Sequence, residues 1–138
     1  MIILDTNVLS ALMRSSPDRE VIDWLDLQPS EAIWITSITE FETRLGLALL
    51  PAGKRRQTVQ SSFERLLEED LDQRVLAFDS DAAAQAATLA ARRQRAGRPV
   101  DMRDTQIAGI ALSRRAALAT RNVRHFDDLA LRVINPWG

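Results

Sequence analysis

Five short apolar segments alternate with longer stretches of helical periodicity along this chain, and this alternation constrains the fold more than any other feature. Each apolar segment is long enough for one strand, and each intervening stretch repeats its apolar residues every three or four positions, as a helix does. Strands that alternate with helices form a mostly parallel sheet with helices covering its faces. The sequence therefore predicts an α/β fold. The predicted strands are residues 2–4, 32–36, 75–78, 118–120 and 132–134.

The predicted helices differ in how clearly their ends are marked. The fifth is the best delimited, because Asp79 and Ser80 offer N-caps and Gly97 followed by Pro99 ends it. In the third, the spacing predicts a buried face made of Ile38, Phe41, Leu45 and Leu49. The predicted helices are residues 7–13, 18–27, 38–49, 55–71, 80–95 and 103–115.

Length and composition favour one domain. A chain of 138 residues can bury a core that needs no covalent staples. It contains no cysteine, which excludes disulfides, thiolate zinc sites and thiol nucleophiles, and which suits the reducing cytoplasm. The N-terminus has no signal-peptide pattern, and no apolar stretch approaches the roughly 20 residues that span a membrane. We therefore expect a single cytoplasmic domain over residues 1–138.

The basic residues are unusual in kind. The formal net charge is −1, so the overall charge does not indicate nucleic-acid binding. Of the 18 basic residues only Lys54 is a lysine, and five arginines gather in one stretch. One guanidinium group can bind two phosphate oxygens at once, so this stretch could form a phosphate-binding surface. The alternative is a helix face that is simply exposed to solvent. The members of the stretch are Arg92, Arg93, Arg95, Arg98 and Arg103.

Two acids follow predicted strands and are candidates for a shared site. Asp5 comes directly after the first strand, at the carboxyl edge where parallel sheets bind their ligands. Glu42 lies in the early turns of the helix that follows the second strand, next to the apolar Phe41. Glu40 is the competing residue on that helix, but its position is closer to the solvent face. Glu42 is therefore the preferred partner of Asp5, and a carboxylate at the rim of the core is the alternative interpretation.

A third acid begins the sixth helix. Asp104 precedes Ile107, Ala108 and Ala111 on the stripe that faces the sheet, which places it at the open end of that stripe. An N-terminal carboxylate that stabilises the helix dipole would occupy the same position. Asp101, three residues earlier, is an alternative candidate.

A polar segment after the fourth strand reaches the same edge. Asn122 offers a neutral oxygen there, while Asp127 and Asp128 are near enough in sequence to supply a charge instead. His125 is the only histidine, and we expect it to be a loop residue bonded to backbone rather than a catalytic base.

Converging carboxylates would need a counter-charge. At about 4 Å and an effective dielectric constant near 20, each like-charged pair costs about 4 kcal/mol. Such a cluster either raises a pKa or binds a cation. An all-oxygen set selects a hard cation, Mg²⁺ or Mn²⁺, and such ions promote hydrolysis of phosphodiesters.

Five short motifs lie in order over essentially the whole chain. They are Ile2-Ile3-Leu4-Asp5-Thr6-Asn7, Ile38-Thr39 with Glu42 and Gly46, Asp104 with Ile107-Ala108, Thr120-Arg121-Asn122-Val123-Arg124-His125-Phe126, and Val133-Ile134-Asn135-Pro136-Trp137. The first four resemble the motifs of PIN-domain nucleases, and the last resembles the ending of the VapC-type toxin branch. Each motif alone is weak, but the ordered set is specific.

The resemblance implies a three-layer α/β/α sandwich, Mg²⁺-dependent endoribonuclease activity and a homodimer. It also implies a cognate VapB-like antitoxin that inserts a peptide into a groove of the toxin, in a complex that can bind operator DNA. Asp5, Glu42 and Asp104 fall on the family's acidic positions, so they are the expected metal ligands and, together with Asn122, the expected catalytic residues. The fourth acidic position of many members is Asn122 here, which bears on the number of metal ions more than on activity.

The sequence thus predicts the ribonuclease toxin of a toxin–antitoxin pair. Arginines of the fifth helix and of the 121–124 loop would hold RNA phosphates. Leu12, Trp24 and the apolar side of the third helix would form the walls of the antitoxin groove. The alternative is a non-catalytic binding module that acts through its antitoxin in a DNA-bound repressor. A phosphoacceptor domain is disfavoured, because Lys54, the sole lysine, lies in a mid-chain loop.

Overall fold

A five-stranded parallel sheet forms the centre of the molecule, in a computed structural model that describes residues 1–138. The strand order is β3-β2-β1-β4-β5, and every neighbouring pair is parallel. The predicted α/β class is therefore confirmed. The strands are β1 (Ile2–Leu4), β2 (Ile33–Thr36), β3 (Val75–Leu76), β4 (Ala117–Ala119) and β5 (Val133–Ile134).

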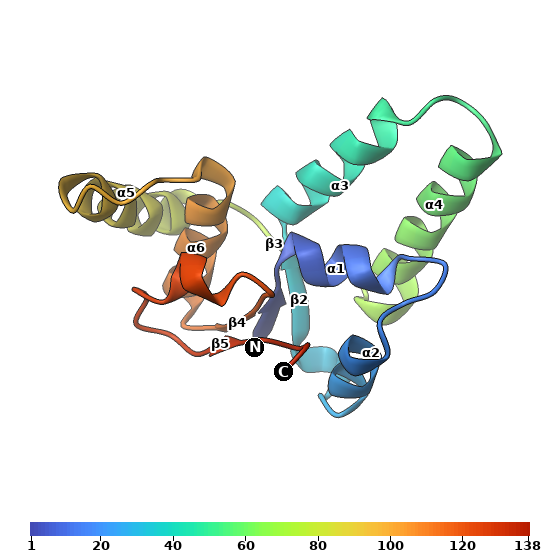
Figure 1. The fold of residues 1–138 in the computed structure, drawn as a ribbon, viewed down its shortest axis with the longest axis horizontal. Coiled ribbons are helices and arrows are strands. Elements are labelled where there is room, and N and C mark those ends of the chain that lie inside the picture. Colours follow the sequence, from blue (N-terminus) through green and yellow to red (C-terminus); the bar gives the residue numbers. More distant parts are fainter.

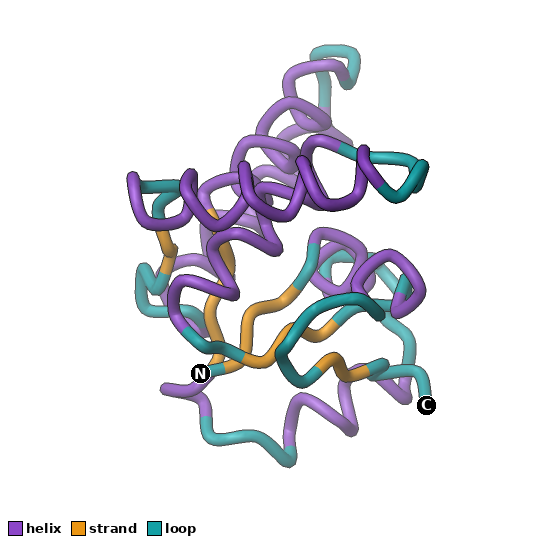
Figure 2. The backbone as a smooth tube through the Cα atoms, turned by 90° about the vertical axis from the view of Figure 1, so that its left-hand side faces the viewer, coloured by secondary structure: helices purple, strands orange, loops and turns teal.

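Helices cover both faces of this sheet, which gives the three-layer α/β/α sandwich that the resemblance implies. Figure 1 shows α5 and α6 on one side of the strands and the remaining helices on the other, and Figure 2 shows the strands between these layers. None of the helices has the length and apolar character needed to cross a membrane. The helices are α1 (Thr6–Leu12), α2 (Arg19–Asp26), α3 (Ser37–Leu49), α4 (Lys54–Arg65), α5 (Ser80–Arg95) and α6 (Met102–Arg114).

Alternating residues of the strands build two separate cores. Ile3 and Leu118 face the layer of α5 and α6, whereas Leu4 and Ala119 face the layer of α1, α2 and α4. Successive side chains of a strand point to opposite faces, so a strand buried on both sides carries apolar residues at every position. This is why the strand segments read as continuous apolar runs.

The predicted fourth helix ends differently from the prediction. Regular α-helix stops at Arg65, and the chain continues as a π-helical turn from Leu66 to Asp70. The apolar side of this segment is nevertheless continuous across the change, because Phe63 and Leu67 are both buried in the second core.

The buried face predicted for α3 is correct only at its start, where Ile38 packs against the first core. Phe41 and Leu49 are 55% and 76% exposed, while Thr39 and Leu47 are buried. Figure 1 shows α3 leaving the sheet at its first turn and projecting away from it, so only one narrow face of the helix is covered. Glu42 therefore lies near the sheet because it follows the buried Thr39 by almost one turn, and not because it neighbours Phe41.

Candidate functional site

Asp5 is buried at the carboxyl end of β1, with only 3% of its surface exposed. Its Oδ1 accepts a hydrogen bond from the Thr6 backbone N–H at 2.8 Å. Its Oδ2 accepts from the Thr120 hydroxyl at 2.7 Å and from the Asn7 side-chain amide at 3.2 Å. Burial raises the pKa of this carboxyl to about 6, and the charges of Asp104 and Glu42 add to the rise, although the bonds from Thr120 and Thr6 oppose it.

Asn7 and Thr120 connect Asp5 to the loop that follows β4. The Asn7 side-chain oxygen accepts from the Arg121 backbone N–H at 3.1 Å, and the Thr120 hydroxyl accepts from the Asn122 backbone N–H at 3.0 Å. The Asp5 carboxylate is thereby fixed in one orientation. The sequence did not predict a positioning role for Asn7 or Thr120, although both are polar and both follow buried strands at the same edge.

Glu42 reaches this edge from α3. Its Oε1 accepts from the Thr6 hydroxyl at 2.9 Å, and its Oε2 lies 3.4 Å from the Arg103 guanidinium. Glu40 points elsewhere, because it pairs with Arg44 one turn later, at 2.9 Å. Of the two acids weighed from the sequence, only Glu42 contacts a neighbour of Asp5.

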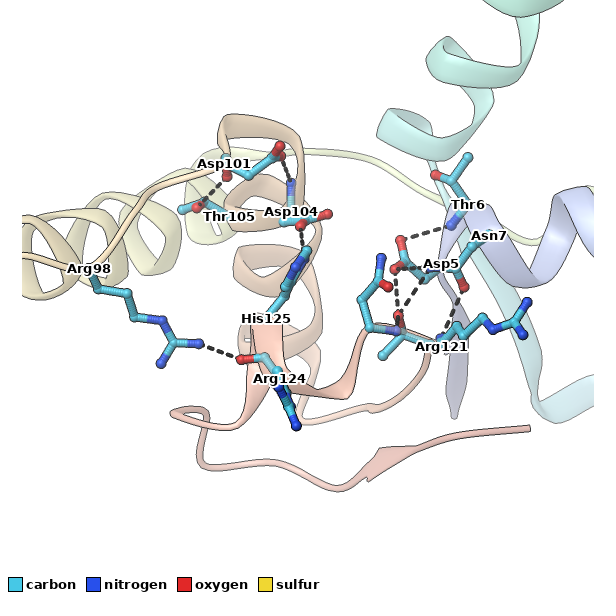
Figure 3. Close-up of polar contacts among 12 residues, drawn as sticks. Asp5, Thr6, Asn7, Arg98, Asp101, Asp104, Thr105, Arg121, Arg124 and His125 are labelled. Carbon is cyan, nitrogen blue, oxygen red and sulfur yellow. Dashed lines mark hydrogen bonds and ion pairs between the residues drawn. The ribbon is translucent and has the colours of Figure 1, made fainter. Parts of the chain in front are cut away.

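Asp104 approaches from α6 and is paired with His125. The helix begins after Asp101, whose carboxylate accepts from the Asp104 backbone N–H at 2.9 Å and acts as the N-cap. The Asp104 carboxylate is thus free to face the edge, where its Oδ2 lies 2.8 Å from Nδ1 of His125. Figure 3 shows this pair opposite Asp5 with Thr6 and Asn7. The expectation that the His125 ring bonds to backbone is wrong.

The acids that competed with Asn122 are held away from the edge. Asp128 forms two 2.9 Å hydrogen bonds with Arg93, and Asp127 lies 2.9 Å from Arg98. These arginines lower the pKa of Asp128, with the Arg93 hydrogen bonds as the main cause. Asn122 is exposed and lies two residues after Thr120, whose hydroxyl accepts from the Asn122 backbone N–H, so of the three candidates it is the one that stays beside the residues around Asp5.

The arginine stretch is largely structural. Arg93 is 3% exposed and also donates to the His125 backbone carbonyl at 2.7 Å. Arg98 donates to the Arg124 carbonyl at 2.6 Å, as Figure 3 shows. Arg121 of the loop lies over the Trp137 ring at 4.7 Å. Most of the guanidinium groups expected to bind phosphate therefore hold the loop after β4 in place.

Three carboxylates from three elements thus converge on one edge of the sheet. Glu42 has a counter-charge in Arg103, and Asp104 has a hydrogen-bond partner in His125. As these side chains stand, no group of three or more acidic, histidine or cysteine residues is close enough to hold a metal ion. The all-oxygen donors and the raised pKa of Asp5 nevertheless suit a hard divalent cation, for which Glu42 and Asp104 would turn from their present partners.

A groove of about 1010 Å³ opens beside Glu42, between α1, α3 and α4. Leu12 and Trp24, predicted as walls of the antitoxin groove, do not line this groove; both pack against the second core instead. From α3, Thr43, Gly46 and Leu47 line it.

Comparison with known proteins identifies the family. The family model described as PIN domain matches residues 2–131. A protein named VapC ribonuclease Y4jK, from Sinorhizobium fredii, is 42% identical over 137 residues, which cover 99% of this chain and 98% of that protein. Toxin FitB from Neisseria gonorrhoeae is 34% identical over 137 residues, with 99% of each covered.

The fold comparison agrees with the sequence comparison. A solved structure of FitAB bound to a DNA fragment superposes with a TM-score of 0.90 at 34% identity, covering 100% of this chain and 96% of that one. The likeness extends over the full chain and includes all three layers. The chain therefore belongs to the PIN-domain family, alongside the VapC-type toxins.

Proposed function

We propose that this protein is a Mg²⁺-dependent endoribonuclease and the toxin of a toxin–antitoxin pair. The observation that carries the proposal is the convergence of Glu42 and Asp104 on the buried Asp5, whose pKa their charges help to raise. The ribonuclease and toxin names of the similar proteins point to the same activity.

Asp5, Glu42 and Asp104 would hold Mg²⁺, with Mn²⁺ as a substitute. When bound at such a site, a divalent ion polarises a phosphoryl oxygen and lowers the pKa of its water. Asp5 is suited to this task because Thr6, Asn7 and Thr120 fix both of its oxygens. The Thr6 hydroxyl holds one oxygen of Glu42 and leaves the other to its weaker contact with Arg103.

The groups around the acids would act on the substrate. Arg103 and His125, which now contact Glu42 and Asp104, would be free to face the phosphodiester if a cation took their place. Asn122 would orient water at the edge through its neutral amide. Single-stranded or looped RNA is the expected substrate, because its bases and backbone are accessible to side chains.

The proposed partners are a VapB-like antitoxin and a second copy of this chain. The similar protein FitAB is solved on DNA, which supports a toxin–antitoxin complex on operator DNA for this chain as well. The same structure motivates the alternative that the protein acts only as a binding module within such a repressor.

Cleavage by the isolated chain distinguishes the two functions. Purified protein freed of antitoxin is incubated with total cellular RNA in the presence of Mg²⁺ or EDTA. We expect cleavage with Mg²⁺ only, and its loss in Asp5→Asn, Glu42→Gln and Asp104→Asn. Glu40→Gln is the matched control on α3 and should retain cleavage. RNA that stays intact under both conditions would favour the binding module.

A further inference from the structure

The groove between α1, α3 and α4 opens directly on the acidic edge. Thr6 and Glu42, which contact each other at 2.9 Å, line one end, and Lys54 and Arg55 at the start of α4 line the other. A polymer bound at the acids therefore has a continuous path into the groove. The volume of about 1010 Å³ is large enough to hold several residues of such a chain.

The lining of the groove carries positive charge. Arg14, Lys54 and Arg55 lie along it, and Glu42 is the only acid among the lining residues. Neither Lys54 nor Arg55 has a carboxylate within ion-pair distance. Arg14 has one partner, the half-buried Asp18, at 3.3 Å. These cations differ from Arg93 and Arg98, which are committed to Asp128 and Asp127.

Hydroxyl groups accompany these cations. Ser10, Ser15 and Ser16 line the groove from α1 and the segment after it, and all three are exposed. Lysine, arginine and serine side chains are among the groups that contact phosphate and sugar oxygens. Met13, Leu47, Leu50 and Val59 also line the groove, but no aromatic side chain does, so it offers no surface on which bases would stack. The charged and hydroxyl side chains of the lining thus match a sugar–phosphate backbone and not the identity of the bases.

We propose that this groove binds the backbone of single-stranded RNA on one side of the cleaved bond, with phosphates on Lys54, Arg55 and Arg14. The inference rests on the proposed ribonuclease function, because it makes the groove an extension of that site. It also replaces the arginines of α5 as the source of phosphate contacts. An acidic peptide would meet the same charges, but the string of hydroxyls leading to the acids favours RNA.

The test measures binding separately from cleavage. A fluorescein-labelled single-stranded RNA is titrated with the full chain in EDTA, by anisotropy, at several salt concentrations between roughly 50 and 200 mM. Lys54→Gln/Arg55→Gln is compared with Arg56→Gln/Arg65→Gln, which removes the same charge from the same helix outside the groove. Each phosphate contact on a single strand contributes about 0.7 to the slope of log affinity against log salt.

We expect the groove variant to lower this slope by about 1.4 and to weaken binding by about tenfold at low salt, with the control close to the parent. If the groove variant and the control behave alike while the parent still cleaves RNA with Mg²⁺, the groove is not the RNA path and only this inference fails. If the parent neither binds nor cleaves RNA, the proposed function itself fails. A groove variant that keeps RNA binding and loses capture of a glutamate-rich peptide would assign the groove to a peptide.

Discussion

Asp5 is the acid of the site whose burial costs the most free energy. An ionised carboxylate that is removed from water costs free energy unless bonds or a counter-charge compensate it. Three hydrogen bonds stabilise the charged form here, yet burial still raises its pKa from 3.8 to about 6. A position that is costly in the isolated chain is what a cation-binding carboxylate requires.

Replacement of Asp5 should separate activity from stability. Asp5→Asn removes the buried charge, so we expect RNA cleavage to be abolished while the metal-free protein becomes as stable as the parent or more so. The upper limit of the gain at pH 8 is about 3 kcal/mol, the free-energy equivalent of the rise in pKa. Thermal unfolding in EDTA measures it, with the exposed Asp26→Asn as control. A variant that unfolds many degrees earlier would show that Asp5 stabilises the fold instead.

Asn122 should tune metal dependence without being essential. Polar groups just outside a metal's ligands typically change affinity or activity by about 10–100-fold. We therefore expect Asn122→Ala to reduce cleavage without abolishing it. Asn122→Asp adds a negative charge, so it should lower the Mg²⁺ concentration for half-maximal rate and destabilise the metal-free protein. Mg²⁺ titrations of cleavage rate test this, and three coincident curves would make Asn122 an ordinary loop residue.

The position of a single residue in the fold was predictable where its neighbours in the sequence determine it. Asp5 is the first residue after a buried strand, and parallel topology alone brings it to the ligand-binding edge. The contact between Asp104 and His125 was not predictable, because it joins α6 to a short 3-10 helix in the loop after β4, 21 residues away. That loop is shaped by Arg93, whose burial nothing in the local pattern indicates.

At the scale of elements, one ion pair holds the loop after β4 against α5. The Asp128 carboxylate faces the buried Arg93, which keeps its pKa low. Asp128→Asn leaves that guanidinium without its counter-charge, and should destabilise the fold by about 2 kcal/mol. This is below the roughly 3–5 kcal/mol of a fully buried pair, because Asp128 retains some exposure. Asp127→Asn, at the exposed neighbour, should cost under about 1 kcal/mol in the same denaturant titration.

The same pair predicts a loss of stability in acid. A carboxyl whose pKa is lower in the folded state than in the unfolded state stabilises the fold above its unfolded pKa, near 4. This stabilisation is lost as pH falls through the folded pKa. The difference in unfolding free energy between parent and Asp128→Asn should therefore be full at neutral pH and shrink below about pH 4. A difference that stays constant down to pH 2 would show that Asp128 acts by shape alone.

The packing of α5 on α6 depends on a glycine. A Cβ on Gly109 would lie 2.6 Å from the Ala82 carbonyl oxygen and 2.7 Å from the Ala86 Cβ. Gly109→Ala should therefore push the helices apart and cost about 1–3 kcal/mol of unfolding free energy. Gly46→Ala is the matched control, because a Cβ there meets nothing within 4 Å, and it should be neutral or stabilising. Equal stability of the two variants would mean that α5 and α6 repack without cost.

The faces of helices were harder to predict than their existence. Periodicity placed α3 correctly but chose Phe41 and Leu49 for the core, because a pattern of apolar residues does not tell how much of a helix touches the sheet. Only the first turns of α3 do so; farther on, Leu47 is buried in the second core while Leu49 is exposed to solvent. The groove itself follows from this projection and has no counterpart in the local sequence.

At the scale of the whole molecule, the site exists only when the layers are assembled. Asp5 comes from the sheet, Glu42 from one helical layer and Asp104 from the other. No single helix or strand contributes more than one of the three acids. The ordered motifs predicted their meeting because they specify the family, whereas composition and net charge gave no sign of an RNA-cleaving site.

The intact molecule should be toxic through this assembled site. Induced expression of the parent chain without its antitoxin is expected to arrest growth, and co-expression of the cognate antitoxin should restore it. Asp5→Asn keeps the fold and removes a proposed metal ligand, so cells expressing it should grow normally while the variant still co-purifies with the antitoxin. Growth curves and a pull-down with tagged antitoxin measure both properties. If Asp5→Asn arrests growth as the parent does, toxicity arises from binding and not from RNA cleavage, and the alternative of a non-catalytic module takes its place.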